Sequence, residues 1–212
     1  EQIGKFDAWE KTGVIPNEQL DYYKQHACPS CGACSFMGTA STMQIMAEVL
    51  GLMLPGTALM PSTAPELKEA AYKAGKQLMD LVSKGIKASD IVTKESFENA
   101  IMVHAAISGS TNATMHIPAI AHEIGFDFDI AMANEISAKT PNLCHLAPAG
   151  PTYMEDLNEA GGVYAVINQL CEAGLINEDC MTVTGKTLGE AVKGHVNKNP
   201  EVIRTLDNPY SK

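Results

Sequence analysis

Cys28-Pro-Ser-Cys31-Gly-Ala-Cys34 opens the stretch that decides the fold of this 212-residue chain, and Ser41 to Leu54 completes it. The first part is expected to form a loop, because Pro29 and Gly32 disfavour a regular helix. The second part is apolar almost all round, and a helix of that kind is usually buried in a protein core. The sequence therefore predicts a cysteine-bearing loop that brings its thiols close to the start of a buried helix.

The C-x2-C-x2-C spacing of this loop allows its thiolates to converge on one metal site. A helix N-terminus favours negative charge and lowers the pKa of a nearby thiol, which suits a metal–thiolate site. The residues alone leave three interpretations open. The first is an iron–sulfur site, since the spacing resembles the start of a ferredoxin-type run. The second is a structural zinc site completed by a further ligand such as His26. The third is a set of small buried thiols that bind no metal.

The composition excludes several classes of function. Hydrophobic residues make up 45% of the chain and charged residues 19%, as in globular proteins, and the net charge is −10. That charge, without any basic run, argues against binding nucleic acids or anionic membranes. The longest apolar stretch, near residues 45–54, is too short and too interrupted to span a membrane. We expect a cytoplasmic protein that is a segment of a larger one, with no nucleic-acid or membrane partner.

Hydrophobic periodicity predicts a mainly helical chain with a few short strands. A long amphipathic helix is expected to start at Thr63, with Glu66 completing a capping box, and to stop at Gly85. Further helices are expected over residues 93–108, 111–124, 130–139 and 162–173, and strands over residues 143–146 and 181–183. This alternation predicts an α/β fold in which helices pack on a mostly parallel sheet. Strands outside this chain would explain why its own strand signal is weak.

Four blocks of the sequence resemble one known family. The first runs from Cys34 to Gly56 and includes Met37-Gly-Thr-Ala-Ser-Thr-Met43. The others are Ser108-Gly-Ser-Thr-Asn112, which resembles a Gly-Gly-Ser-Thr-Asn loop, then residues 153–163, and then Arg204-Thr-Leu-Asp-Asn-Pro-Tyr210. In this order they resemble the dihydroxy-acid dehydratase and phosphogluconate dehydratase family. The resemblance implies that residues 1–200 belong to its N-terminal α/β domain. Residues 201–212 would begin the linker to a C-terminal domain that is absent here.

The resemblance also implies a reaction and its cofactors. Members are hydro-lyases that convert a 2,3-dihydroxy carboxylic acid into a 2-keto acid, in branched-chain amino-acid synthesis or, as an alternative, on sugar acids (aldonates). They use an iron–sulfur cluster, [2Fe-2S] or [4Fe-4S], together with Mg2+. An open iron would act as a Lewis acid on the leaving hydroxyl group. The expected partner is a small dihydroxy acid, and the full-length protein is expected to be a homodimer.

Site residues carry over from the resemblance only in part. Cys34 matches the cluster ligand of this block, whereas Cys28 and Cys31 are weaker candidates. The loop Ser110, Thr111 and Asn112 would bind the substrate, although simple helix capping would also explain these residue types. The family's Cys-Asp-Lys motif is absent, and the catalytic base is expected outside this chain. We therefore expect the isolated chain to be inactive. A non-catalytic zinc-binding module that uses the three clustered cysteines is the alternative from another class.

Overall fold

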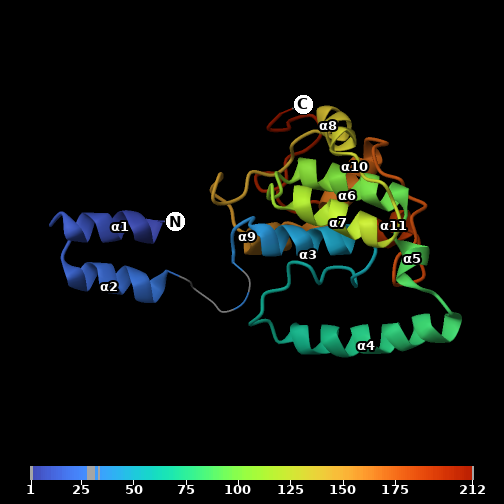
Figure 1. The fold of residues 1–212 in the computed structure, drawn as a ribbon, viewed down its shortest axis with the longest axis horizontal. Helices are drawn as coiled ribbons and strands as arrows, with labels where there is room; N and C mark the ends of the chain where they lie inside the picture. The colour runs from blue at the N-terminus through green and yellow to red at the C-terminus, as the bar shows by residue number, and fades with distance from the viewer. Residues whose placement is uncertain (1, 28–31, 33, 212) are drawn as a thin grey trace. The chain divides into compact units, whose positions relative to one another are not determined.

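The computed structural model describes residues 2–27, 32 and 34–211 (Figure 1). The chain divides into two compact units, residues 1–32 and 33–212, and each is described by itself. The first unit contains α1 (Gln2–Lys11) and α2 (Asn17–His26), which pack against each other. Phe6 of α1 stacks on Tyr23 of α2 with ring centroids 4.2 Å apart. Aromatic contacts therefore account for much of the pairing between these two helices.

The second unit is a bundle of helices around one core. Its helices are α3 (Thr39–Val49), α4 (Glu66–Lys84), α5 (Ala88–Ile91), α6 (Lys94–Ala106), α7 (Ala113–Glu123), α8 (Ile130–Ala138), α9 (Met154–Glu159), α10 (Gly162–Glu172) and α11 (Leu188–Val192). The central helices α3, α6 and α10 contact one another. Helix α7 packs on α3, α8 packs on α6, and both α9 and α11 pack on α10. The structure confirms the helices that the periodicity predicts, which are α4, α6, α7, α8 and α10.

Helix α3 is the buried helix expected directly after the cysteine loop. Ile45, Met46 and Val49 are almost completely buried in it. The helix is shorter than predicted because Gly51 adopts a left-handed φ of +80° just beyond its end. A Cβ atom at Gly51 would lie 2.7 Å from the Met181 carbonyl oxygen, so only glycine fits here.

The predicted mostly parallel sheet is not confirmed. In the described part of the chain, β structure is limited to isolated bridges, such as Asn142 with Ser211. The expected strand over residues 143–146 is buried, but its backbone groups bond elsewhere. The N–H groups of Leu143 and Cys144 donate to the Ala106 carbonyl at the end of α6, and the Leu143 carbonyl accepts from Arg204 N–H. The end of α6 and the loop at Arg204 thus provide the hydrogen-bond partners that neighbouring strands would provide in a sheet.

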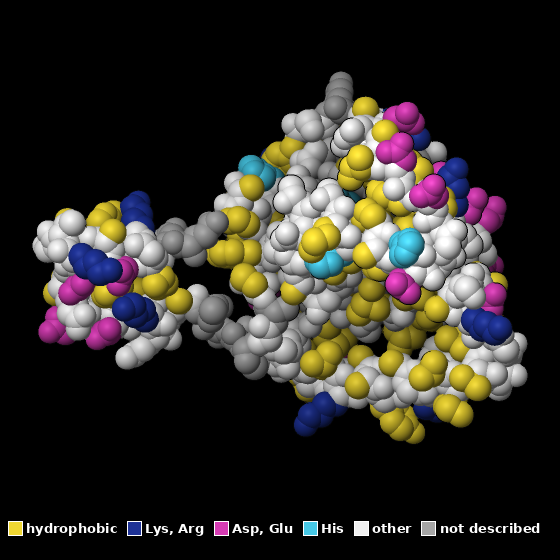
Figure 2. Space-filling view, viewed as in Figure 1, with side chains coloured by type: hydrophobic (Ala, Val, Ile, Leu, Met, Phe, Trp, Pro, Cys, Tyr) yellow, Lys and Arg dark blue, Asp and Glu magenta, His cyan; other side chains and the backbone are white. Residues whose placement is uncertain are grey.

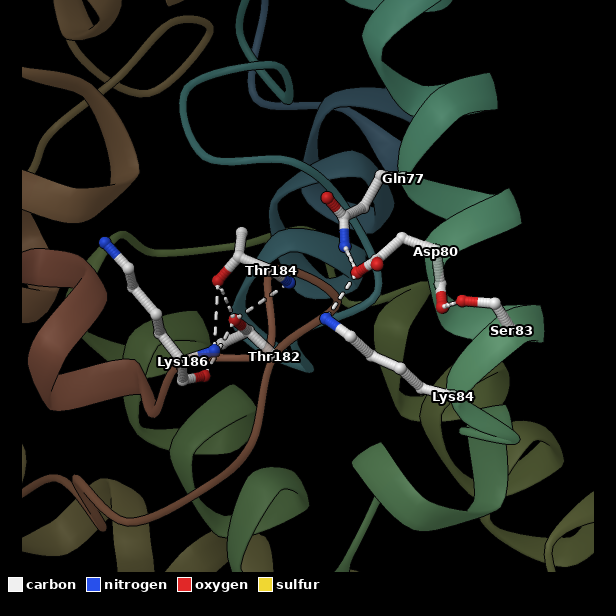
Figure 3. Close-up of polar contacts among 7 residues, drawn as sticks. All are labelled: Gln77, Asp80, Ser83, Lys84, Thr182, Thr184 and Lys186. Atoms are coloured by element: carbon white, nitrogen blue, oxygen red, sulfur yellow. Dashed lines mark hydrogen bonds and ion pairs between the residues drawn. The ribbon is translucent and has the colours of Figure 1, made fainter.

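Helix α4 has an apolar stripe that the described residues cover only in part. Leu81 is buried, but Leu67, Leu78 and Val82 are 37%, 60% and 62% exposed. Figure 2 shows apolar side chains along this helix. In Figure 3 the dashed lines at Asp80 lead only to other α4 residues, while Thr182, Thr184 and Lys186 form a separate network. Helix α4 therefore contributes little to the core.

The ends of α4 fit the sequence prediction only in part. Gly85 ends the helix as predicted, with a φ of +68° and its N–H bonded to the last carbonyl groups. The predicted capping box at Thr63 is wrong. Pro65 occupies the N-cap position instead, without a side-chain hydrogen bond, and the helix begins at Glu66.

Residues 201–211 pack against the rest of the second unit. Val202 and Ile203 are buried in the core. The linker that we expected to start at residue 201 stays a prediction. Among the described residues, no helix is long and apolar enough to cross a membrane.

Candidate active site

Cys34 lies in the loop directly before α3, as the sequence predicts. Of the four cysteines that the structure describes, Cys34 alone is exposed. Its carbonyl oxygen accepts a hydrogen bond from Ser41 Oγ at 3.1 Å, which fixes the loop against the first turn of the helix. The N-cap residue Gly38 has no side chain that could accept a hydrogen bond from the first N–H groups of α3. These N–H groups form the positive end of the helix dipole.

The family's third block holds the Cys34 loop from one side. Met154 N–H donates to the Ser35 carbonyl at 3.0 Å, and Met37 N–H donates to the Ala147 carbonyl at 2.8 Å. The rings of Phe36 and Tyr153 are nearly parallel, with centroids 6.0 Å apart. Segments more than 100 residues apart in the sequence therefore meet at the loop that carries Cys34.

The second block holds the start of α3 from another side. Ser110 N–H donates to Thr42 Oγ1 at 2.9 Å, and Asn112 Nδ2 donates to Thr39 Oγ1 at 2.5 Å. His104 Nε2 lies 3.0 Å from the Ser110 carbonyl oxygen. The loop thus has contacts both to α3 and to the end of α6.

Ordinary helix capping does not explain Asn112. It occupies the N-cap position of α7, yet its side chain makes no capping hydrogen bond and donates to α3 instead. Thr111 and Asn112 are exposed and Ser110 is partly buried. The three predicted substrate-binding residues therefore lie together beside the start of the helix that follows Cys34. Their role in substrate binding stays a prediction.

A polar cleft of about 490 Å³ adjoins this loop. Its polar lining includes Ser108, Ser137, Asn142, His145, Tyr210 and Ser211. His145 meets the Tyr210 ring edge-on at 5.3 Å, and the Arg204 guanidinium lies 4.9 Å from the same ring. The fourth family block, residues 204–210, therefore reaches the same side of the molecule as the second block.

The other described cysteines have the properties of core thiols. Burial raises the pKa of Cys144 to about 12. Burial also raises the pKa of Cys171 to about 12, with a further contribution from Glu178 and Glu172. The pKa of Cys180 is raised as well, mainly by burial. These groups stay protonated near neutral pH, whereas a metal ligand must be a thiolate. Cys34 is the better candidate ligand.

Glu48 is a buried carboxyl group within α3. Its two oxygens accept hydrogen bonds from the N–H groups of Gly56 and Ala58. Burial nevertheless raises the pKa of Glu48 to about 7. The nearby Tyr164 hydroxyl is buried without a hydrogen-bond partner, and burial and the Glu48 charge both raise its pKa. Glu48 therefore holds the turn after α3, and we assign it no contact with substrate.

The described residues do not by themselves form a complete metal site. Among them, no three His, Cys, Asp or Glu side chains gather in a group that could hold a metal ion. Cys28 and Cys31 lie outside the described residues. His26, the possible fourth zinc ligand, stacks on Tyr22 in α2, with its Nδ1 2.7 Å from the Tyr22 carbonyl oxygen.

Comparison with known proteins identifies the family. The model of the dihydroxy-acid/6-phosphogluconate dehydratase N-terminal family matches residues 1–191. The chain belongs to this family. Proteins named dihydroxy-acid dehydratase from Agathobacter rectalis and Lachnospira eligens are 55% and 54% identical to it over all 212 residues. A third, from Clostridium beijerinckii, is 50% identical over the same length. The chain spans 37% of the length of each of these relatives.

Sequence reasoning missed several residues that build this site. Thr39 and Thr42 are three residues apart on α3, so their hydroxyl groups lie on one side of its first turn. In the sequence, His104 lies six residues before Ser110, and Asn142 lies 32 residues after it. The position of the two threonines within the first family block was a usable signal. No local pattern in the sequence points to His104 or Asn142.

Proposed function

We propose that the complete protein dehydrates a 2,3-dihydroxy carboxylic acid to a 2-keto acid in branched-chain amino-acid synthesis. The observation that carries this proposal is the meeting of three family blocks at the start of α3, through the Thr42–Ser110 and Ser35–Met154 hydrogen bonds. The names of the relatives support the same reaction. Family membership alone would suggest the reaction, but it would not explain why these distant segments converge.

In this proposal Cys34 is one ligand of an iron–sulfur cluster. Its thiol is exposed, in the loop that leads into α3, and is therefore accessible to a metal. When bound, the cluster would supply Lewis-acid assistance to the departing hydroxyl group. One thiol cannot hold a cluster, so further cysteine ligands, the Mg2+ ligands and the base would come from other parts of the complete protein. The isolated chain would then be inactive.

The loop Ser110, Thr111 and Asn112 would bind and orient the substrate carboxylate. These side chains offer two hydroxyl groups and one amide beside the start of α7, where the helix dipole also favours an anion. Among the described residues, those that line the adjoining cleft carry hydroxyl, amide and imidazole groups and no carboxylate. The chain's own contribution is thus to position one cluster ligand and to hold the acid.

Replacing Cys34 with serine in the complete protein tests this assignment. We expect Cys34→Ser to abolish turnover of 2,3-dihydroxyisovalerate and to lower bound iron and acid-labile sulfide. The matched control is Cys171→Ser, which changes a partly buried thiol beside the core and should leave the cluster intact. A Cys34→Ser enzyme with full iron content and full turnover would refute the assignment.

A sugar-acid dehydratase is the second candidate, because Met37-Gly-Thr-Ala-Ser-Thr-Met43 resembles that branch of the family. Comparing turnover of an aldonic acid with that of 2,3-dihydroxyisovalerate separates the two. A colourless protein that holds zinc and no iron would instead favour the non-catalytic module. We also propose a cytoplasmic homodimer, which gel filtration of the complete protein would check. Strands outside this chain would complete the expected parallel sheet.

A further inference from the structure

Ser108 has an unusual backbone conformation at the edge of the substrate-binding loop. Its φ of +54° makes it the one non-glycine residue with positive φ in the part of the chain that the structure describes. A left-handed conformation is unfavourable for an L-residue with a side chain and persists only where neighbouring groups enforce it. Ser108 directly follows the C-cap residue of α6, a position where a left-handed conformation commonly ends a helix but is usually taken by glycine. A serine here benefits from a group that offsets the cost of its side chain.

The side chain of Asn142 provides this restraint. Its Nδ2 donates to Ser108 Oγ at 2.6 Å and also lies 3.3 Å and 3.5 Å from the carbonyl oxygens of Ala105 and Ala106. One amide thus joins the last turn of α6 to the residue that leaves it. All three acceptor groups belong to the segment that leads into the loop.

The backbone of Asn142 is itself firmly held. Its N–H donates to the Ser211 carbonyl and its carbonyl accepts from Tyr210 N–H, each at 2.9 Å. Leu143 N–H donates to the Ala106 carbonyl at 2.7 Å. These backbone hydrogen bonds fix the position of Asn142 independently of the loop that its side-chain amide contacts.

The conformation of Ser108 determines where the next residues lie. Gly109 N–H returns to the His104 carbonyl at 2.9 Å, and Ser110 N–H then reaches Thr42 Oγ1 at 2.9 Å. We propose that Asn142 is a positioning residue that holds Ser108 left-handed and thereby places Ser110 and Asn112 for substrate. The proposal rests on the proposed function of this loop, and Asn142 itself need not touch substrate.

Amide hydrogen exchange on the complete enzyme tests the restraint without reference to activity. Asn142→Ala should speed exchange at Gly109 and Ser110 by about tenfold, because both amides lose their fixed geometry. The matched control is Asn168→Ala, which removes an asparagine whose side-chain amide donates to Glu172 in its own helix, α10. Unchanged exchange at Gly109 and Ser110 in Asn142→Ala would overturn the proposal.

A double-mutant cycle with Ser108→Gly tests the positioning role. Asn142→Ala alone should lower kcat/KM for the dihydroxy acid by about tenfold, the size of one lost hydrogen bond together with the released backbone strain. Glycine adopts a φ of +54° without a penalty, so Asn142→Ala should cost less than about threefold in the Ser108→Gly background. An equal loss in both backgrounds, or no loss with Asn142→Ala, would overturn the role. If the wild-type enzyme dehydrates neither substrate, the proposed function fails, and the exchange result still decides the restraint.

Discussion

Glu48→Gln should make the stability of this protein less dependent on pH. The Glu48 side chain is almost completely buried in α3, and its oxygens accept two backbone N–H groups from the turn at Gly56 and Ala58. Those hydrogen bonds favour the ionised form, but burial outweighs them and raises the pKa of Glu48 from 4.5 to about 7. Glutamine keeps the shape of the protonated acid and cannot ionise.

The size of the effect follows from that pKa shift. The difference between 4.5 and about 7, at about 1.36 kcal/mol per pKa unit, corresponds to about 3 kcal/mol. The folded protein binds this proton more tightly than the unfolded chain does. The stabilisation is therefore fully present below pH 4.5, declines between the two pKa values and is lost above about pH 7. The free energy of unfolding of wild type should fall by about 3 kcal/mol relative to Glu48→Gln across this range.

Urea unfolding at a series of pH values measures this difference. Far-UV circular dichroism is the suitable signal, because it follows the loss of helices, α3 included. Glu123→Gln, which alters an exposed carboxyl group at the end of α7, is the control and should follow the wild-type pH profile. Parallel pH profiles for wild type and Glu48→Gln would show that Glu48 is ionised across the range and that burial does not dominate.

Two further predictions address the turn after α3 and the thiols. Gly51→Ala should lower the free energy of unfolding by at least about 1–2 kcal/mol, since the φ of +80° and the Met181 carbonyl both oppose a Cβ atom. Urea unfolding checks this value, and a neutral effect would contradict the packing described here. In the folded protein without its cluster, iodoacetamide should modify the exposed Cys34 and leave Cys144 unmodified, because burial raises the pKa of Cys144 to about 12. Peptide mass spectrometry would identify the modified residues, and equal labelling of both would refute the assignment.

Sequence reasoning predicted the local features of this fold well. The long helices and the burial of α3 follow from periodicity, which depends on residues close together in the chain. Gly85 was recognised as a helix end for the same reason. The capping box at Thr63 is wrong because Pro65 is the N-cap residue, so that the helix begins at Glu66, two residues later than the capping pattern required.

The sequence could not predict how distant segments pair. The expected strand at residues 143–146 has the right composition, but its hydrogen bonds go to the end of α6 and to Arg204. The Thr42–Ser110 bond joins residues 68 positions apart, and no local pattern encodes such a contact. Family motifs identified which blocks form the site, whereas the groups that hold them together, such as Asn142, needed the tertiary structure.

The limited contact of α4 with the core makes it a natural place for protein engineering. A helix of 19 residues is about 28 Å long, so a replacement spacer would need about nine extended residues to join its two ends. Because Leu81 is the buried side chain within α4, such an exchange would remove little of the hydrophobic core. A fluorescent reporter or an affinity peptide inserted there should not change the packing of the helices around Cys34.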